Sequence, residues 1–318
     1  MRFLVTGVNG QLGYEIVKRL IEEGYRQDQI LATSLNIDEI IQKGEITNVV
    51  KMDITNQYDV ENIITSYNPD IIYHCAAWTS VDAAENPQNK YKCYDVNVNG
   101  TKNIIRAAEG IDAKVVYFST DYVFDGTKHG AYMEDDEVNP QSVYGLTKYQ
   151  GEEEVRKYYK SFIIRTSWVF GINGKNFVKK MLDLSERYDT LTVVNDQIGS
   201  PTYAKDLACV AYDLSKTKQY GTYHCTNGGF CSWAKFAAYI LKDTNTKVVP
   251  VTTEEYYKPQ YENANGKTLY IAPRPKFSVL DNSKLLNIGI RLPQDWMQAT
   301  DEFINEIKTI EKNKTLKK

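Results

Sequence analysis

The sequence is poor in the residues that build metal centres and disulfide frameworks. Its 318 residues include five cysteines, which are scattered and form no Cys-x-x-Cys pair. Such spacing provides neither the ligand set of a zinc site nor the cross-links of a small secreted domain. We therefore predict no metal site and no disulfide framework. Cysteines within apolar runs are typical of buried thiols, and we expect such a chain in the reducing cytoplasm.

Long apolar runs and an excess of positive charge are also lacking. No run approaches the ~18 residues of a membrane span, and Arg2 leads straight into Phe3-Leu4-Val5 without the pattern of a cleavable signal. The net charge of −3 gives no basic footprint for nucleic acid. With 42% hydrophobic and 25% charged residues, the composition is typical of a soluble globular protein. We expect neither nucleic acid nor a membrane among its partners.

The first pattern present is a strand, a glycine-rich turn and a helix. Arg2–Thr6 is a short apolar run that predicts a buried strand, and the helical spacing of residues 14–23 ends at Gly24. Between them lies the turn GVNGQLG. Glycines let such a turn bend sharply and approach a pyrophosphate, which sits at the helix N-terminus. In this context the turn predicts a bound dinucleotide, contacted by Gly7, Asn9, Gly10, Gln11, Leu12 and Gly13.

Strands and helices then alternate through about half of the chain. Apolar runs predict further strands at residues 30–33, 49–52, 70–74, 114–118 and 162–166. Helical spacing occurs between them, at residues 60–67, 91–109 and 144–159. This order predicts an α/β fold of the Rossmann type, a doubly wound parallel sheet with helices on both faces.

The alternation loosens after residue 166. We predict an NAD(P)-binding Rossmann domain over residues 1–166 and a smaller C-terminal substrate-binding lobe over residues 167–318. Some elements at about residues 191–218 are expected to return to the first domain. No repeat, low-complexity segment or clear linker interrupts the chain, which favours two closely associated lobes.

The ends of the predicted strands carry further candidates for cofactor binding. Asp53, followed by Ile54, ends the third strand, where a carboxylate could accept the adenine amino group. A turn or helix-capping aspartate is the alternative. His74 precedes the end of the fourth strand, so a hydrogen-bonded core role is favoured over catalysis. Small residues that follow it leave room for a ribose and nicotinamide against the backbone: Cys75, Ala76, Ala77 and Thr79.

Three other positions bear on the cofactor. Asn97 lies in the middle of a predicted helix, where polar residues on a packed face suggest hydrogen bonds between helix and sheet. Phe118 lies near the end of the fifth strand, facing the same region. The end of the second strand, Ser34-Leu35-Asn36, offers neither the acid typical of NAD sites nor the arginine typical of NADP sites. The choice between NADH and NADPH therefore stays open.

The strongest chemical pattern follows the fifth strand. Thr120 stands at its end, and Tyr144 and Lys148 lie four residues apart on one face of the next predicted helix. An ammonium beside a phenol favours the phenolate and should lower the pKa of Tyr144 from about 10, which suits a proton donor near neutral pH. Thr120 could hold a substrate carbonyl through its hydroxyl. Because Tyr-x-x-x-Lys is common in a chain with 24 tyrosines, an ordinary amphipathic pair is the alternative.

Together these residues resemble the extended branch of the short-chain dehydrogenase/reductases and, within it, the dTDP-4-dehydrorhamnose reductases. The glycine turn, Asp53, residues 97–101, Thr120 and the Tyr144/Lys148 pair match the branch. More specific signs run in order over nearly the whole chain: STDYVFDG at 119–126, RTSWVFG at 165–171, DQIGSPT at 196–202, Tyr223-His224, and Arg274-Pro275 with Ser278, Leu280-Asp281 and Lys284-Leu285.

The resemblance implies a reaction and a role for each residue. NADH or NADPH would deliver hydride to C4 of dTDP-4-dehydro-L-rhamnose (dTDP-6-deoxy-L-lyxo-4-hexulose), giving dTDP-L-rhamnose for cell-surface polysaccharide. Tyr144 would protonate the new C4 oxygen, Lys148 would tune Tyr144 and hold the nicotinamide ribose, and Thr120 would orient the carbonyl. The residues implied at the sugar are Thr120, Asp121, Tyr122 and Trp168. Those implied at the nucleotide and diphosphate end are Asn176, Phe177, Gln197 and Arg274. A guanidinium between two prolines suits bidentate phosphate contact, with a surface ion pair as the alternative.

Other readings of the same family remain. Cys75 stands where many relatives have asparagine or another small residue, a minor departure. The family contains a non-catalytic relative, the regulatory subunit of methionine adenosyltransferase, although intact Thr120, Tyr144 and Lys148 argue against a pure binding role. A reductase or epimerase of another nucleotide sugar is the third alternative. Some relatives pair as dimers, partly through metal-bound carboxylates, so a homodimer is a candidate assembly; no ligand cluster here has metal-like spacing.

Overall fold

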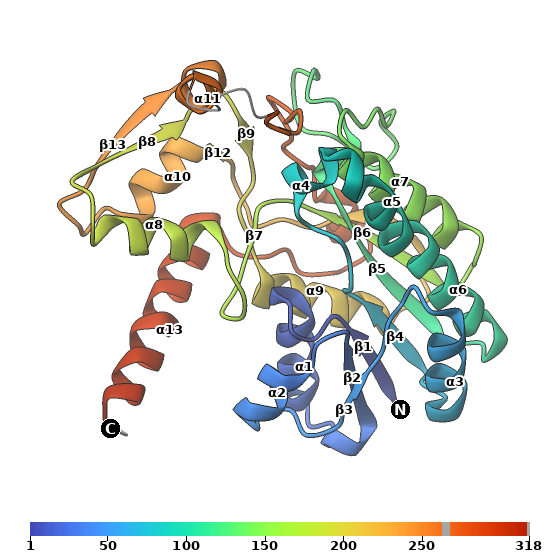
Figure 1. The fold of residues 1–318 in the computed structure, drawn as a ribbon. Helices are drawn as coiled ribbons and strands as arrows, with labels where there is room; N and C mark the ends of the chain where they lie inside the picture. Colours follow the sequence, from blue (N-terminus) through green and yellow to red (C-terminus); the bar gives the residue numbers. More distant parts are fainter. Residues whose placement is uncertain (263–267, 317–318) are drawn as a thin grey trace.

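The computed structural model describes residues 1–262 and 268–316 and is organised around a parallel sheet (Figure 1). Seven strands lie in the order β11-β6-β5-β4-β1-β2-β3, and each neighbouring pair is parallel. Their bounds are β1 Phe3–Thr6, β2 Ile30–Ser34, β3 Val49–Lys51, β4 Ile71–His74, β5 Lys114–Thr120, β6 Ser161–Thr166 and β11 Gly221–His224. The order reverses between β1 and β4, which opens a crevice at the carboxyl ends of these strands. The predicted doubly wound α/β fold is confirmed.

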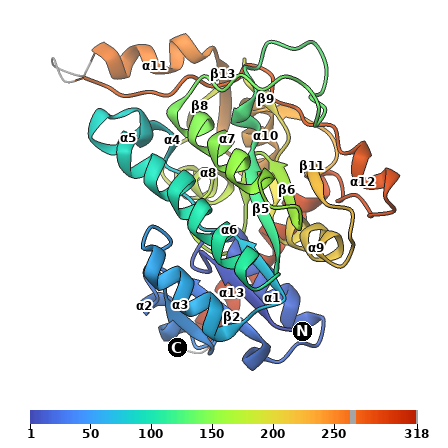
Figure 2. The ribbon, with the colours of Figure 1, turned by 90° about the vertical axis from the view of Figure 1, so that its right-hand side faces the viewer.

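Helices cover both faces of the main sheet. One face is covered by α1 Gln11–Glu22, α2 Asp38–Lys43 and α9 Ala204–Ser215. The other face, turned toward the viewer in Figure 2, is covered by α3 Gln57–Tyr67, α6 Thr101–Gly110 and α7 Val143–Arg156. Strand residues alternate between these two cores, so that Phe3 and Val5 pack on the α1 side and Leu4 on the α3 side. Burial on both faces explains why the strands are continuous apolar runs in the sequence.

The connection from β4 to β5 is a long helical stretch whose geometry changes in the middle. It consists of α4 Val81–Glu85, α5 Pro87–Tyr94, a π-helix Asp95–Gly100 and α6. The helix predicted at residues 91–109 is thus present, with a π-helical segment inside it. Gly100 lies so close to Ile54 that an added Cβ would come within 2.7 Å of the isoleucine side chain. Segments of this kind are frequent at functional sites.

The smaller lobe lies on the left of Figure 1, where its last helix runs down to the C-terminus. Its strands pair as β7 Val169–Phe170 with β10 Thr202–Tyr203, β8 Thr190–Val194 with β13 Lys247–Val251, and β9 Ile198–Gly199 with β12 Cys231–Ser232. Its helices are α8 Phe177–Ser185, α10 Trp233–Ile240, α11 Thr253–Glu262 and α13 Trp296–Leu316. An aromatic core that includes Phe170, Phe236 and Phe303 holds these elements together.

Elements from the second half of the chain complete the main sheet. α9 packs on α1, β11 extends the sheet beside β6, and α12 Ser283–Asn287 packs Leu285 into the same core. Of the stretch expected to return, residues 191–218, α9 does so, whereas β8 pairs with β13 in the smaller lobe. A later strand, β11, also joins the main sheet, although it lies beyond that stretch. The division of the chain into two domains at residue 166 stays a prediction.

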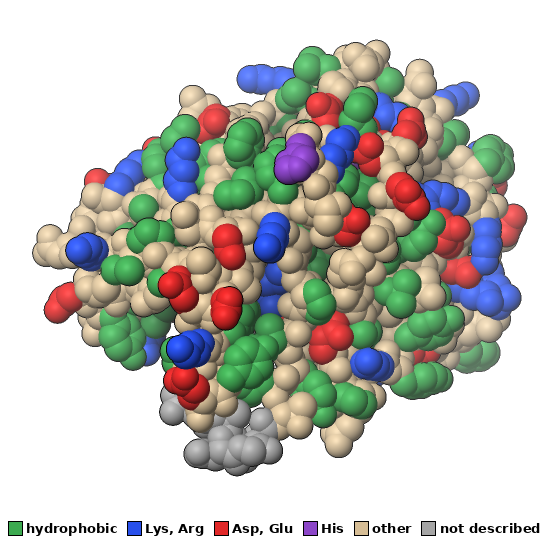
Figure 3. All heavy atoms as spheres, turned by 90° about the horizontal axis from the view of Figure 1, so that it is seen from above, with side chains coloured by type: hydrophobic (Ala, Val, Ile, Leu, Met, Phe, Trp, Pro, Cys, Tyr) green, Lys and Arg blue, Asp and Glu red, His purple; other side chains and the backbone are tan. Residues whose placement is uncertain are grey.

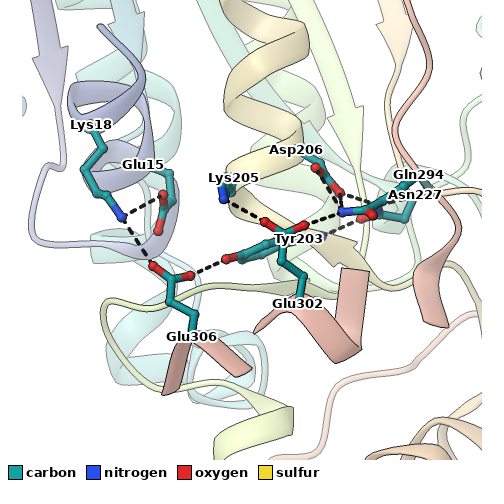
Figure 4. A network of polar contacts seen from close by, with 9 residues as sticks. All are labelled: Glu15, Lys18, Tyr203, Lys205, Asp206, Asn227, Gln294, Glu302 and Glu306. Atoms are coloured by element: carbon teal, nitrogen blue, oxygen red, sulfur yellow. Dashed lines mark hydrogen bonds and ion pairs between the residues drawn. The ribbon is translucent and has the colours of Figure 1, made fainter. Parts of the chain in front are cut away.

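A network of charged and polar side chains joins α13 to α1 and α9 (Figure 4). Lys18 pairs with Glu306 at 3.3 Å and lies 3.9 Å from Glu15, while Lys205 pairs with Glu302 at 2.6 Å. Burial raises the pKa of the Glu15 carboxyl to about 7. The other members of the network are Tyr203, Asp206, Asn227 and Gln294. Polar contacts therefore hold the C-terminal helix against the helices of the main sheet.

Acidic and basic side chains intermix on the face seen from above, rather than gathering by sign (Figure 3). All five cysteines are free thiols. Within residues 1–262 and 268–316, no helix combines the length and the apolar character needed to cross a membrane.

Candidate active site

A groove of about 600 Å³ runs along the carboxyl ends of the central strands. This volume lies within the range of about 300–1,000 Å³ that is typical of ligand sites. Of the predicted cofactor residues, those that line the groove are Gly7, Asn9, Gly10, Gln11, Leu12, Gly13, Asp53, Ile54, Cys75, Ala76, Ala77, Thr79, Phe118, Tyr144 and Lys148. Segments that are far apart in the sequence therefore meet at one surface, as the strand ends of a parallel sheet should.

The glycine turn presents bare backbone to this groove. Gly7 has φ +66°, and a Cβ there would lie 2.8 Å from the backbone of Ala76. A Cβ on Gly13 would lie 2.5 Å from the carbonyl oxygen of Gly7, because the first turn of α1 packs directly on the turn. Gly10 is the N-cap of α1, so the unsatisfied N–H groups of that helix point toward the groove.

The adenosine end of the groove is polar but carries little charge. Ser34 and Asn36 line it at the end of β2, and the Ser34 hydroxyl donates to Asn9 Oδ1 at 2.7 Å. Asp53 lines it at the end of β3. Its Oδ1 accepts from the Thr55 N–H at 3.0 Å and from the Thr55 hydroxyl at 2.8 Å, as a turn aspartate does.

Asn97 is placed differently from the other predicted cofactor residues. It is buried and is not among the residues that line the groove. Its Oδ1 accepts from the Trp78 N–H at 2.8 Å, and its Nδ2 donates to Thr147 Oγ1 at 3.0 Å. Asn97 therefore ties the loop after β4 to α7, whereas its mid-helix position had suggested hydrogen bonds between helix and sheet.

His74 is a satisfied core residue. The Ala76 N–H donates to Thr6 Oγ1 at 2.9 Å, which leaves the Thr6 hydroxyl to donate to His74 Nδ1, also at 2.9 Å. His74 Nε2 then carries the proton and donates to Thr101 Oγ1 at 3.2 Å. Burial lowers the pKa of the imidazole to about 3, and nearby Lys148 adds to this effect. The neutral, doubly hydrogen-bonded ring supports the loop that follows β4.

Three contacts fix the helix that carries Tyr144. The Ser142 hydroxyl accepts from the Gly145 N–H at 3.0 Å, and Glu85 Oε1 accepts from the Val143 N–H at 2.7 Å. A Cβ on Gly145 would lie 2.2 Å from the Tyr122 carbonyl oxygen. The first turn of α7 is therefore capped on its free N–H groups and packed against the 3₁₀ helix Asp121–Val123.

A buried ion pair fixes the far end of α7. Arg165 on β6 donates from Nε and Nη2 to both carboxylate oxygens of Glu152, at 2.9 and 2.8 Å. Both side chains are almost fully buried, at 1% and 0% exposure. Burial by itself raises the pKa of Glu152, but the Arg165 contacts outweigh it and hold that pKa below its usual value. The pair sets the register of α7 on the sheet and so the position of Tyr144 and Lys148.

Tyr144 and Lys148 both face the groove, but their electrostatics differ from the expectation. Burial lowers the pKa of Lys148 to about 7, with Glu152 opposing the shift. Its Nζ lies 4.1 Å from the centroid of the Tyr117 ring. Burial also raises the pKa of Tyr144 above its ordinary value. The predicted lowering of the Tyr144 pKa by Lys148 is therefore wrong for the free protein, because desolvation of the phenolate dominates and the group that opposes it is Thr120.

Thr120 is already engaged in the free protein. Its hydroxyl donates to Asp121 Oδ1 at 3.0 Å and accepts from the Tyr122 N–H at 3.2 Å. The same hydroxyl is within hydrogen-bonding reach of Tyr144 and acts to lower the pKa of that phenol. Burial raises the pKa of Asp121 to about 6, so this carboxyl gains a proton in mildly acidic solution. Thr120 and Tyr144 are brought together as predicted, with Asp121 beside them.

Aromatic rings surround the residues that the sequence predicted at the sugar. The Tyr122 ring meets the Tyr144 ring edge-on, with centroids 5.6 Å apart. Trp168 adopts φ +48°, an unusual conformation for a large residue, and stacks on Trp233 with centroids 3.6 Å apart. Phe177 packs against the same Trp233 at 4.5 Å. Phe177 therefore supports the tryptophan pair.

The remaining predicted substrate residues lie in different places. Asn176 caps α8 and donates to Gln11 Oε1 at 3.0 Å, which places it over the glycine turn. Gln197 is buried and donates to the Thr253 hydroxyl at 3.0 Å. Arg274 donates from Nη2 to Asp82 at 2.8 Å and lies with its guanidinium 5.8 Å from the Tyr257 ring centroid.

Sequence reasoning missed several residues of this region. Lys92 and Lys175 line the groove, and Lys175 follows Gly174, whose added Cβ would lie 3.6 Å from the Gln11 side chain. Asp82 holds Arg274, and Trp233 stacks on Trp168. No local pattern marks these residues, since the two lysines are isolated charges and Asp82 and Trp233 act through partners distant in the sequence.

A parallel doubly wound sheet with a glycine turn and a Tyr–Lys pair in its crevice is the arrangement of the extended short-chain dehydrogenase/reductase class. A family model described as the RmlD substrate binding domain matches residues 1–309. The chain belongs to this family.

Named relatives and a solved structure agree with this assignment. The chain is 40% identical over 308 residues to the spore coat polysaccharide biosynthesis protein SpsK of Bacillus subtilis (strain 168), covering 96% of this chain and 97% of that protein. It is 37% identical to the dTDP-4-dehydrorhamnose reductase of Aggregatibacter actinomycetemcomitans, covering 94% and 96%. The crystal structure of the dTDP-4-dehydrorhamnose reductase of Bacillus anthracis str. Ames in complex with NADP superposes with a TM-score of 0.83 at 38% identity, covering 96% and 99%.

Proposed function

We propose that this protein is an NAD(P)H-dependent reductase that converts the C4 ketone of dTDP-4-dehydro-L-rhamnose to the hydroxyl of dTDP-L-rhamnose, for cell-surface polysaccharide synthesis. The observation that carries the proposal is that Tyr144 and Lys148 face the same groove as the glycine turn. Relatives named dTDP-4-dehydrorhamnose reductase, aligned over nearly their whole length, support the choice of sugar.

The groove fits a nicotinamide dinucleotide. Gly7 and Gly13 offer bare backbone for a pyrophosphate, and Lys175 adds a positive charge to the wall of the groove. Asp53 Oδ2 suits the adenine amino group. Among the described residues that line the rim after β2, none is a carboxylate that would repel the 2′-phosphate of NADPH. We therefore propose that both NADH and NADPH bind. Bound there, the cofactor supplies the hydride for the ketone.

Tyr144 holds and then gives up a proton. Because burial raises the pKa of Tyr144, its phenol keeps the proton until a strong base forms beside it, and the alkoxide at C4 is such a base. Charged Lys148 stabilises the phenolate that remains. Thr120 orients the carbonyl through its hydroxyl, which becomes free to donate to the substrate when Asp121 takes up a proton.

The sugar and the nucleotide are held on the other wall. Tyr122 and Trp168 give flat apolar faces to a deoxysugar, and the Trp233 stack keeps Trp168 in its strained conformation. Arg274 has guanidinium donors left for a diphosphate. Asn176 and Gln197 shape this wall through Gln11 and Thr253.

The compartment and the assembly are separate proposals. Five free thiols suit the reducing cytoplasm, which we propose as the site of action. The homodimer stays a prediction, which light scattering of the purified protein would test.

The decisive experiment is a turnover assay. The protein is mixed with the dTDP-4-keto-6-deoxy sugar and with NADH or NADPH in separate reactions, and the product sugar is identified by NMR. We expect stoichiometric oxidation of either cofactor and formation of dTDP-L-rhamnose. Turnover without added reductant, by cofactor that copurifies with the protein, would indicate an epimerase instead. Absence of turnover with any nucleotide sugar would favour a regulatory subunit.

A further inference from the structure

Asp82, on the short helix α4, holds the segment that carries Arg274. Its Oδ1 accepts from the Ala272 N–H at 2.9 Å, and its Oδ2 accepts from Arg274 Nη2 at 2.8 Å. Arg274 Nη1 in turn donates to the Ala272 carbonyl oxygen at 3.0 Å. One carboxylate thus fixes both the backbone and the guanidinium of this segment, across 192 residues of sequence.

The contacts with Asp82 and Ala272 leave most of the N–H donors of the Arg274 guanidinium available. A guanidinium has five N–H donors, and these contacts use two of them. The Arg274 side chain is 19% exposed, so the remaining donors are positioned by burial rather than mobile in solvent. The backbone of Gly126 packs closely on Pro275, the residue after Arg274. A Cβ added to Gly126 would lie 2.5 Å from the Pro275 Cβ. The arginine is therefore held on both sides.

The position of Arg274 relates it to the catalytic residues. Burial raises the pKa of Tyr122 and the nearby charge of Arg274 opposes that shift, while the Tyr122 ring contacts the Tyr144 ring. An anion at Arg274 would thus lie one aromatic ring away from the proposed proton donor. This spacing suits a diphosphate with its sugar directed toward Tyr144.

Helix α4 also reaches the other half of the site. Its Glu85 accepts from the Val143 N–H at the start of α7, at 2.7 Å. The loop just before α4 supplies Ala76, Ala77 and Thr79 to the cofactor groove. One five-residue helix therefore contacts the cofactor loop, the catalytic helix and the Arg274 segment.

We propose that Asp82 is a positioning residue that holds Arg274 in place for the diphosphate of the nucleotide sugar. The inference rests on the proposed function, which supplies the substrate class. The carboxylate stays on Arg274 when the diphosphate binds, because leaving would break its bond to the Ala272 N–H as well. Its effect is on binding of the diphosphate, and the proton and hydride steps do not depend on it.

The test is Asp82→Asn, with two kinds of readout. We expect KM for the dTDP-4-keto sugar to rise about tenfold, which corresponds to about 1.4 kcal/mol, while kcat stays within about twofold. Calorimetry without turnover should show the same loss of affinity for thymidine diphosphate and no loss for thymidine. Arg274→Ala should cost more, and adding Asp82→Asn to it should cost nothing further, because Asp82 acts only through Arg274.

Asp301→Asn is the matched control. Its carboxylate is 44% exposed, close to the 46% of Asp82, and it pairs with Lys242 at 2.6 Å in the smaller lobe. The control should leave all these constants unchanged. Unchanged or tighter thymidine diphosphate binding in Asp82→Asn, or additive losses in the double variant, would overturn the proposal. If the wild-type protein bound thymidine diphosphate in an Asp82-dependent way but reduced no sugar, the proposed function would fail and this inference would stand.

Discussion

The cofactor half of the site, which is the groove along the strand ends, and the proposed substrate half beside it differ in what forms their walls. The cofactor half is made largely of backbone at strand ends, where Gly7 and Gly13 allow no side chain. The proposed substrate half, beside that groove, is made of side chains, each held by another side chain: Trp168 by Trp233 and Arg274 by Asp82. A backbone surface is encoded by a short local motif, whereas a side-chain surface depends on partners up to 192 residues away. Substitutions should therefore affect the two halves separately, except where one element serves both.

α7 is such an element, because it carries both Tyr144 and Lys148. Breaking the buried pair between Glu152 and Arg165 should give the largest loss of stability. In Glu152→Gln, Arg165 loses its counter-charge at 1% exposure. Leaving a buried charge unpaired costs about 3–5 kcal/mol, which chemical denaturation would measure. Glu153→Gln is the control, because Glu153 is the next residue of the same helix and pairs with Arg156, but is 50% exposed. It should cost at most about 1 kcal/mol. Equal losses in the two variants would contradict the anchoring role.

Lys148 tests the electrostatics of the cofactor half. Its pKa is lowered to about 7, so the lysine is charged below that pH and loses its proton as the pH rises through it. Affinity for NADPH should therefore fall between pH 6 and pH 8, by up to about tenfold for a one-proton requirement. Calorimetric titration at several pH values would measure this. The Lys148→Met variant should bind NADPH more weakly than the wild type. Its NADPH affinity should also lose the part of the pH dependence that is due to the Lys148 ammonium. Wild-type affinity independent of pH would contradict the assignment.

Gly13→Ala tests whether the cofactor half is a backbone surface. The new Cβ would lie 2.5 Å from the Gly7 carbonyl oxygen and force the turn away from α1. Overpacking of this kind costs about 1–3 kcal/mol, and affinity for NADH and NADPH should fall while thymidine diphosphate still binds. Gly110→Ala, where nothing lies within 4 Å of the added atom, is the control. Parallel losses of cofactor and thymidine diphosphate would show that the halves are not independent.

Glu15 tests the junction between the lobes, with the smallest expected effect. Its pKa is raised to about 7 from 4.5, so the folded state binds more protons than the unfolded state between these values. The free energy of unfolding should therefore fall as pH rises from about 4.5 to 7, and level off above. Glu15→Gln should remove this slope and stabilise the protein by on the order of 1–2 kcal/mol at pH 8. Glu22→Gln, at an exposed position on the same helix, should neither remove the slope nor stabilise the protein. Destabilisation by Glu15→Gln at pH 8 would refute the account.

The sequence predicted features that are encoded locally. Alternating apolar runs and helical spacing predicted the parallel sheet, and GVNGQLG predicted the turn at Gly7–Gly13. Two kinds of feature could not be predicted from the sequence. The Tyr144/Lys148 spacing indicated that the two share a face, but a pattern does not measure burial, which decides the direction of the Tyr144 pKa. The place of β11 beside β6 depends on packing between distant segments, which no single run of residues encodes.

Tyr144→Phe tests the central claim most directly, since it removes one hydroxyl from a ring whose place in the groove is fixed by α7. Turnover of the dTDP-4-keto sugar and affinity for NADPH are measured on the same preparation. The account predicts that kcat falls by about 10²–10⁴-fold, the usual worth of a positioned acid, while NADPH affinity changes by less than about threefold. Wild-type turnover in the phenylalanine variant would contradict it.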